Sequence, residues 1–519
     1  MAGGWGIARR ACARYLGAGG LVWRGAKTIA IVGVDIGTQS LKAVVLDDGL
    51  GLLGEAARAY DAHYPRPGWA EQAPALWEAA LGPAIAEALE QAAVAKHQVA
   101  ALGIAGQLDG CVPVDGQGRA LGPCLIWMDR RAEAEAAGID AAQLRRRTGV
   151  TLDASHMAAK IRWLKRRSPE AAGAVRFHQP VSYLVARLTG EHLFDHGLAS
   201  TTMLYSLDAR AFDPELLAAF EVSAHELPAV AHASDRAGAL SAQGAALSGL
   251  PAGIPVAVGT GDDFSTPLGA GLVEAGRVAC VLGTAEVVGA LDPAAKIDDG
   301  GLVETHAYVG GSYYVENPGW LSGGALTWLG GLLGLADAAA LDRLAGEVAP
   351  GAEGVTFLPA LSGAMAPEWI ASARGCFYGL TPAHGAGHLA RAVLEGCAFA
   401  MRDVVERLAE LEVAAEALLL LGGGARSALW AQIRADCTGL PVQVPAQTDT
   451  SPVGAALCAA VAGGLHPNLV ACAALVGRIA ETLHPEPARR AAYDEAYHTY
   501  RRLFDSLRPL YERRHDEPA

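Results

Sequence analysis

The sequence predicts an α/β protein made of two duplicated domains. A strand, a short Gly-Thr turn and a returning strand occur at residues 29–46 and again at residues 277–290. The two turns lie close to half of the 519-residue chain apart, a spacing that favours a duplicated domain over a solenoid, whose repeats span about 20–50 residues. The 63 Gly residues and a hydrophobic content of 51% are typical of an α/β enzyme with many tight turns.

The first half opens with an apolar, β-branched run. Residues 29–34 predict a strand, residues 35–40 a polar turn, and residues 41–46 a returning strand. A helix is expected over residues 71–95, where large apolar side chains recur every four residues. Further strands over 99–105 and 254–258 each run into a Gly-rich polar loop.

The second half repeats this order. Strands over 277–282 and 286–290 flank Gly283 and Thr284, and an apolar strand over 417–421 leads into three glycines and a helix over 428–436. We expect one domain at 28–270 and the other at 271–510, with the boundary in the Gly-rich stretch 269–276. Chance similarity between two short Gly-Thr turns is the alternative, because glycine turns are common between strands.

The N-terminal segment 1–27 is excluded from this fold. The first 34 residues contain no Asp or Glu and carry several arginines. A targeting segment, a disordered extension and an upstream start codon are all open, and the lack of a compact apolar region with a cleavage site favours the extension.

The composition of the chain argues against two kinds of binding partner, nucleic acids and membranes. The net charge is −14 and no basic cluster occurs, so we expect no nucleic-acid partner. No apolar run reaches the roughly 20 residues of a membrane span, so no membrane partner is expected. The nine scattered Cys residues predict a cytoplasmic location. A homodimer is left open.

The first turn has the chemistry of a phosphate site. Asp35, Gly37, Thr38, Gln39 and Ser40 supply backbone N–H groups, two hydroxyls and one carboxylate. Such a turn suits a phosphate chain, with the carboxylate on the water shell of Mg²⁺. Neither a Walker A loop nor a Rossmann glycine pattern is present in the sequence. An ordinary hairpin is the alternative.

Carboxylates follow several of the predicted strands. Asp262 comes after a buried strand, where a general base for phosphoryl transfer would lie, and Asp263 could share this task or bind a hydroxyl. Asp109 and Asp129 could accept hydrogen bonds from vicinal hydroxyls, and Trp127 could stack on a sugar. Helix caps, solvated turns or salt bridges are the structural alternatives.

The turn at Gly422, Gly423 and Gly424, followed by Ser427 and a helix, is a second candidate nucleotide element. Glycines let a ligand approach the backbone, and a helix N-terminus favours an anion. A plain strand-to-helix turn has the same pattern.

The most specific longer motif is Gly375-Cys-Phe-Tyr-Gly-Leu380, followed by His388-Leu389 and Ala392-Val-Leu-Glu395. This motif resembles a signature of the FGGY family of carbohydrate kinases, and within that family the chain is most similar to the xylulokinases. Gly68-Trp-Ala-Glu-Gln72 with Pro74 and Trp77, Lys160-Ile-Arg-Trp-Leu164, and Tyr183-Leu184 with Leu188-Thr-Gly-Glu191 are similar to further family segments. Met157 and Arg167 depart from the family's N-terminal signature.

The resemblance implies an actin/hexokinase/Hsp70-like (ribonuclease H-like) fold with an inter-domain cleft, and ATP and Mg²⁺ as cofactors. It implies that Asp35 lies on the Mg²⁺ water shell and that Asp262 is the base. Gly283 and Thr284 would form the second phosphate motif, and the adenosine site would contain Gly422, Gly423, Gly424 and Ser427.

One motif departs from the xylulokinases. Where they have Gly-Gln-Met-His-Gly, this chain has Gly106-Gln107-Leu108-Asp109-Gly110. An imidazole both donates and accepts, whereas an ionised Asp only accepts, so the pocket should present a different hydroxyl pattern. Glycerol kinases have an Arg-Glu pair here, of which Asp109 resembles only the Glu.

The sequence therefore predicts ATP-dependent phosphorylation of a ketopentose, with D-xylulose as the leading acceptor. A kinase for another ketose or for a linear polyol such as erythritol or glycerol is the first alternative. A non-catalytic ATP-binding protein of the actin or Hsp70 type is the alternative from a different class.

Overall fold

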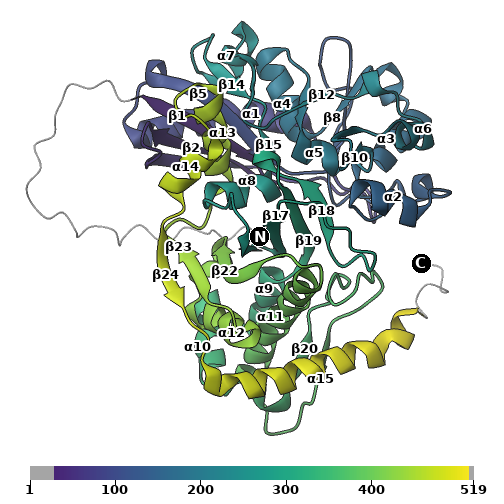
Figure 1. The fold of residues 1–519 in the computed structure, drawn as a ribbon, viewed down its shortest axis with the longest axis vertical. Coiled ribbons are helices and arrows are strands. Elements are labelled where there is room, and N and C mark those ends of the chain that lie inside the picture. The colour runs from purple at the N-terminus through teal and green to yellow at the C-terminus, as the bar shows by residue number, and fades with distance from the viewer. Residues whose placement is uncertain (1–28, 513–519) are drawn as a thin grey trace, which may run out of the picture.

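Two lobes, each built on a mixed β-sheet, make up the computed structural model, which describes residues 29–512 (Figure 1). The N-terminal segment predicted at 1–27 lies outside the described residues.

The first sheet is formed by strands from the N-terminal half. Its order is β13-β14-β5-β1-β2-β3, with β15 also paired to β5. The central strand β1 is antiparallel to β2 and parallel to β5. The bounds are β1 Ala30–Ile36, β2 Ser40–Asp47, β3 Leu52–Ala59, β5 Val99–Gly106, β13 Arg236–Ala239, β14 Pro255–Ala257 and β15 Thr260–Gly261.

The second sheet repeats the order of the six strands on the main path of the first sheet, with β18 added at one edge. Its order is β18-β19-β17-β16-β22-β23-β24, and its central strand β16 is antiparallel to β17 and parallel to β22. The bounds are β16 Gly276–Leu282, β17 Ala285–Asp292, β18 Glu304–Ala307, β19 Tyr313–Leu321, β22 Ala415–Leu421, β23 Val442–Pro445 and β24 Ile479–Leu483. The shared order confirms the predicted duplication.

Short two-stranded pairs lie outside the main sheets. They are β4 Glu71–Gln72 with β7 Cys124–Leu125, β6 Val112–Val114 with β8 Arg176–His178, β9 Leu193–Asp195 with β12 Ala229–Ala231, β10 Tyr205–Ser206 with β11 Ala211–Phe212, and β20 Thr356–Leu358 with β21 Cys376–Tyr378.

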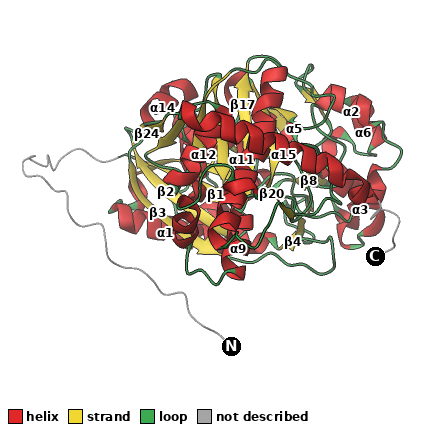
Figure 2. Cartoon of the chain, turned by 90° about the horizontal axis from the view of Figure 1, so that it is seen from below, coloured by secondary structure: helices red, strands yellow, loops and turns green. Residues whose placement is uncertain are grey.

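Helices α11, α12 and α15 pack against one another in the second lobe (Figure 2). The bounds of the helices are α1 Pro74–Ala92, α2 Ala141–Thr148, α3 Met157–Arg167, α4 Pro180–Thr189, α5 His196–Ser200, α6 Pro214–Ala219, α7 Ala242–Ser248, α8 Asp262–Gly269, α9 Gly323–Leu332, α10 Ala338–Gly346, α11 Ala386–Glu410, α12 Ala428–Thr438, α13 Ser451–Ala462, α14 Leu469–Val476 and α15 Pro487–Glu512.

The predicted helix over 71–95 begins later than expected. Glu71 and Gln72 pair with β7 as strand β4, and the helix starts at Pro74, whose fixed φ suits a first helical turn. It ends at Ala92, because Ala93 adopts a left-handed conformation with φ of 54°.

Helix α13 comes late in the chain yet covers the first sheet, where it packs on β1, β5 and α8 (Figure 1). Gly33 and Gly103 are paired neighbours on β1 and β5. A Cβ atom on either would lie 1.9 Å from a backbone oxygen of α13, so only glycine permits this contact. The predicted boundary at residue 270 stays a prediction, but residues after it clearly contribute to the first lobe.

Among residues 29–512, no helix is both long and apolar enough to span a membrane. The eight cysteines within that range are free thiols.

Candidate active site

The first predicted phosphate turn lies at the end of β1. Asp35 was expected in the turn but is the penultimate residue of the buried strand, and it is 5% exposed. Gly37 and Thr38 form the turn with Gln39, and Ser40 begins β2, with the Gly37 N–H donating to the Ser40 carbonyl at 3.0 Å.

Three side chains from elsewhere hold this turn. The Tyr60 hydroxyl donates to the Gly37 carbonyl at 2.7 Å, and Gln72 Nε2 donates to the Thr38 carbonyl at 2.6 Å. Trp127 Nε1 donates to Thr38 Oγ1 at 3.0 Å. The turn is therefore fixed before any ligand binds, which lowers the entropic cost of binding. The Trp127 ring is 43% exposed, so it also has a free surface.

The second predicted turn is held differently. The backbone N–H groups of Ser322 and Gly324 both donate to the Thr284 carbonyl, at 3.1 and 3.0 Å. Gly283 N donates to the Ala285 carbonyl at 2.9 Å. The start of α9 is thereby joined to the hairpin between β16 and β17.

A fully buried ion pair lies beneath this second hairpin. Arg434 Nη1 and Nη2 contact the two carboxylate oxygens of Glu286 at 2.5 and 2.8 Å, and neither side chain is exposed. The Ser322 hydroxyl donates to Glu286 Oε2 at 2.7 Å. Because Arg434 belongs to α12, the pair connects the hairpin with the helix that follows the glycine turn.

The glycine turn lies directly beside the second hairpin. Gly422 has a φ of 78°, and a Cβ there would press on the backbone of Leu282, so this position requires glycine. Gly424 also lies against Leu282, whereas a Cβ on Gly423 would meet nothing within 4 Å. Ser427 caps α12, accepting from the Trp430 N–H at 3.0 Å.

Asp262 and Asp263 begin α8 rather than ending a strand. The expected strand over 254–258 is β14, which ends at Ala257; the separate short strand β15 follows, and Asp262 is the first helical residue after Gly261. Both carboxylates are half-buried, and anions are favoured at a helix N-terminus.

Burial and mutual repulsion raise the pKa values of the clustered carboxyl groups. Burial raises the pKa of Asp35 to about 6, against the opposing effect of Lys42. Burial and the charge of Asp109 raise the pKa of Asp263 to about 7. Burial, then Asp263 and Asp35, raise the pKa of Asp262 well above its usual range. Such perturbed carboxylates are typical of functional sites.

Asp35 also fits a hydrated cation. Its Oδ1 is buried and has no hydrogen-bond partner among residues 29–512. An oxygen acceptor of this kind suits the water shell of Mg²⁺. Within the described residues, no group of three or more His, Cys, Asp or Glu side chains could hold a metal directly. Contact through water, as predicted, needs only the one carboxylate.

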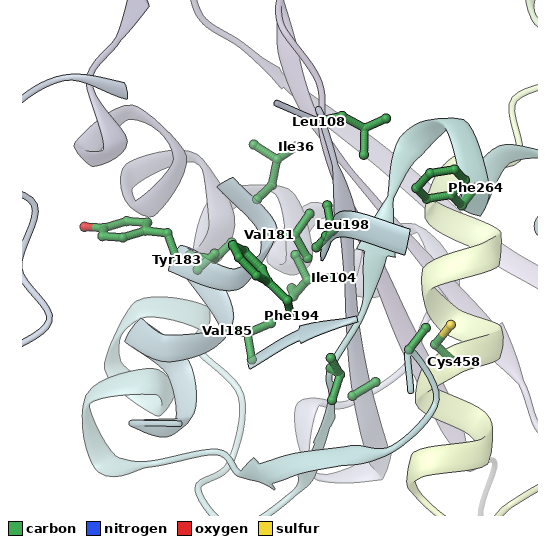
Figure 3. Close-up of a cluster of buried hydrophobic side chains, with 14 of the residues drawn as sticks. Ile36, Ile104, Leu108, Val181, Tyr183, Val185, Phe194, Leu198, Phe264 and Cys458 are labelled. Carbon is green, nitrogen blue, oxygen red and sulfur yellow. The ribbon is translucent and has the colours of Figure 1, made fainter. Parts of the chain in front are cut away.

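Two of the predicted acceptor-binding residues, Gln107 and Leu108, are buried. Gln107 is buried and donates to Gln72 Oε1 at 2.7 Å, which leaves its own Oε1 without a partner among the described residues. Leu108 is 8% exposed and lies with Ile36, Ile104 and Phe264 in an apolar cluster under the site (Figure 3).

The carboxylate of Asp129 already accepts hydrogen bonds from within the protein. It is fully buried, and it accepts hydrogen bonds from the Ala70 N–H at 2.7 Å and from Arg131 at 2.7 to 3.1 Å. These bonds favour a structural role for Asp129 over its predicted contact with a sugar, which stays a prediction.

Sequence reasoning missed His156, Glu304, His306 and Glu316, which gather near Asp109. They come from separate parts of the chain and form no local motif. It also missed Lys42, which lies opposite Asp35 in the register of β1 and β2 and forms an ion pair with Asp449 at 2.7 Å.

Comparison with known proteins identifies the class. The N-terminal domain of the FGGY family of carbohydrate kinases matches residues 30–269, and its C-terminal domain matches residues 278–463. The chain belongs to the FGGY family of carbohydrate kinases, and it is an ATP-dependent kinase.

Similar proteins within this family include xylulose and glycerol kinases. The chain is 32% identical over 491 residues to the xylulose kinase of Escherichia coli (strain K12), covering 92% of this chain and 99% of that protein. It is 34% identical over 445 residues to the glycerol kinase of Thermococcus onnurineus (strain NA1), covering 83% and 89%.

Solved structures agree with the predicted fold. The xylulose kinase from Rhodospirillum rubrum superposes with a TM-score of 0.85 at 32% identity, covering 93% of this chain and all (100%) of the other. Plasmodium falciparum glycerol kinase with ADP has a TM-score of 0.82 at 22% identity, covering 91% and 97%. These matches confirm the predicted family and the two-domain actin/hexokinase-like fold.

Proposed function

We propose that this kinase phosphorylates a ketopentose, with D-xylulose as the leading acceptor and D-xylulose 5-phosphate as the product. The similarity to the xylulose kinases of E. coli and R. rubrum supports this acceptor. The single observation that carries the chemistry is the cluster of Asp35, Asp262 and Asp263, whose charges act on one another at the ends of β1 and β15.

In the proposed reaction, Asp262 accepts the proton of the acceptor hydroxyl. The hydroxyl oxygen forms a bond to the γ-phosphorus as the bond from that phosphorus to the β–γ bridging oxygen breaks, and ADP leaves. The raised pKa of Asp262 makes its carboxylate a better proton acceptor than an ordinary Asp. Asp263, Asp109, Gln107 and Trp127 would bind the acceptor.

The two turns and the glycine element would hold ATP. Backbone N–H groups at Gly37–Ser40 and at Gly283 and Thr284 would contact phosphate oxygens, and Gly422–Gly424 with Ser427 would hold adenosine. Mg²⁺, held through water by Asp35, would neutralise phosphate charge. The predicted cytoplasmic location and the homodimer stay predictions.

A linear polyol is the second candidate acceptor. It is favoured by Leu108 and Asp109, which stand where xylulokinases have Met and His, and by the similarity to glycerol kinases. A panel of D-xylulose, erythritol and glycerol, followed by ADP release, decides between the two. Fast turnover of a polyol with none of D-xylulose would reject the ketopentose assignment.

Asp262→Asn tests the base. We expect kcat to fall by about 10²–10⁴-fold, while ATP still binds, because the amide cannot take the proton. Asp213→Asn is the control, since Asp213 caps α6 outside the site. Full activity in Asp262→Asn would refute the base assignment without affecting the family assignment.

A further inference from the structure

A buried histidine joins the two lobes beside the candidate acceptor residues. His156 is 4% exposed and lies just before α3. Its Nδ1 is 3.2 Å from Asp109 Oδ2, and its Nε2 is 3.7 Å from Glu304 Oε1. Asp109 follows a strand of the first sheet, and Glu304 begins β18 of the second.

Glu304 is itself fixed against the first lobe. The Thr151 N–H donates to Glu304 Oε1 at 2.7 Å, and the Thr305 N–H donates to the Gly149 carbonyl at 3.0 Å. The His156 ring therefore lies between one carboxylate from each lobe, close enough to both for ionic contact.

The charges around His156 keep it protonated. Burial alone would lower its pKa, but the carboxylates of Asp109 and Glu304 raise it well above its usual value. The other ionisable groups that interact with His156 are Asp153 before α3 and His306 on β18. Burial lowers the pKa of His306 to about 4, so this neighbour is neutral and does not compete for the carboxylates.

The backbone of Asp109 is held as firmly as its side chain. Asp109 has a φ of 56°, its N–H donates to Gln179 Oε1 at 3.0 Å, and its carbonyl accepts from Lys160 Nζ at 2.8 Å. With Oδ2 against His156, only Oδ1 remains, and it is buried without a hydrogen-bond partner in the part of the chain that the structure describes. A buried acceptor of this kind requires a donor from water or a ligand.

We propose that His156 is a positioning residue that directs Oδ1 of Asp109 at a hydroxyl of the acceptor. This inference rests on the proposed sugar or polyol kinase activity. An ionised Asp only accepts hydrogen bonds, and Glu304 is a second carboxylate beside the same histidine, with a pKa that its contact with His156 lowers against the opposing effect of burial. The pocket therefore takes an uncharged polyhydroxylated acceptor and rejects a sugar acid, whose carboxylate would be repelled.

Steady-state kinetics of the full chain with D-xylulose, erythritol and D-gluconate test this proposal. In His156→Gln we expect the KM of the accepted neutral substrate to rise about 10- to 100-fold, the effect of one charge-assisted contact. The KM of ATP should stay within about twofold, because His156 has no predicted contact with the nucleotide. His196→Gln is the control: it removes a half-buried histidine of the same lobe, bonded to Tyr205, and should leave both KM values unchanged.

The pH profile separates positioning from general destabilisation. In the wild type, acceptor KM should rise at alkaline pH as His156 loses its proton, and His156→Gln should lack this rise. If His156→Gln does not fold, Glu304→Gln keeps the ring but removes one anchor, and it should raise acceptor KM about 3- to 10-fold.

Wild-type turnover of D-gluconate as fast as of the neutral substrates would overturn the proposed acceptor class. An unchanged acceptor KM in folded His156→Gln or Glu304→Gln would overturn the positioning role while leaving the kinase proposal intact. If the wild type turns over none of a wider panel of neutral sugars and polyols, the proposed function fails, and the role of Asp109 fails with it.

Discussion

The two phosphate hairpins share one backbone arrangement but are supported in opposite ways. Around the first, Tyr60, Gln72 and Trp127 reach the turn with neutral hydrogen bonds. Beneath the second, Glu286 and Arg434 form a fully buried ion pair. Each hairpin joins the central strand of its sheet to an antiparallel neighbour.

This difference shows that the two duplicated domains share their strand order but not the side chains that support the turn. Six strands keep the same order and the same backbone pairing in both sheets, whereas β15 and β18 have no counterpart in the other sheet. The supporting side chains diverge because many arrangements satisfy the same turn. The first hairpin keeps a carboxylate, Asp35, beside its turn, whereas the acid of the second, Glu286, is neutralised by Arg434.

Breaking the buried pair should have the largest effect on stability. Arg434→Met leaves Glu286 buried without a counter-charge, so we expect a loss of about 3–5 kcal/mol in the free energy of unfolding. Thermal unfolding of the full chain, monitored by circular dichroism, measures it. Arg490→Met is the matched control: its partner Asp494 is 36% exposed, so a change within about 1 kcal/mol is expected.

The double variant Glu286→Gln/Arg434→Met sharpens this test. Removing both charges should recover part of the stability lost in Arg434→Met, because no lone charge then stays buried. Equal stability of Arg434→Met and the wild type would show that the ion pair does not support the second hairpin.

Acidic pH should lower the activity by protonating the two aspartates at the start of α8 in the first lobe. Burial raises the pKa of Asp263 to about 7, and burial also raises the pKa of Asp262 well above its usual range, so both carboxylates gain protons as the pH falls. A protonated base cannot accept the hydroxyl proton, so we expect kcat/KM for the acceptor to fall by up to about tenfold per pH unit below about pH 7. Initial rates between pH 5.5 and 8.5 measure it, and a flat profile would contradict the assignment.

Removing one hydrogen bond from the first hairpin should have the smallest effect of the changes considered. Tyr60→Phe removes one neutral hydrogen bond to the Gly37 carbonyl, which is worth about 1 kcal/mol. We expect the KM of ATP to rise about fivefold with little change in acceptor KM. Tyr64→Phe is the control, because Tyr64 is 61% exposed. A loss of stability as large as that of Arg434→Met would remove the contrast between the hairpins.

Local patterns predicted the elements that are built locally. The hairpins at Gly37 and Gly283 and the turn at Gly422 lie where the strand-turn patterns placed them, because strand periodicity and glycine turns are properties of short segments. The helix at 74–92 was predicted except for its start, which depends on the pairing of Gln72 with Cys124.

The features that the local patterns did not predict depend on contacts between segments that are distant in the sequence. Asp262 begins a helix because β15 ends beside β5, which the local sequence does not show. His156 and Glu304 meet although about 150 residues separate them, so no spacing rule could join them. The fold could be predicted from repeated local patterns and resemblance, whereas the acceptor side of the site required three-dimensional proximity.

The crossing of α13 onto the first sheet has a consequence for synthesis in the cell. The strands β1 and β5 emerge early from the ribosome, but the helix that seals Gly33 and Gly103 is among the last segments made. At about 5–20 residues per second, that face waits for roughly tens of seconds. The first lobe is therefore begun first and completed last, and a nascent chain stalled before residue 451 would present an open apolar face to chaperones.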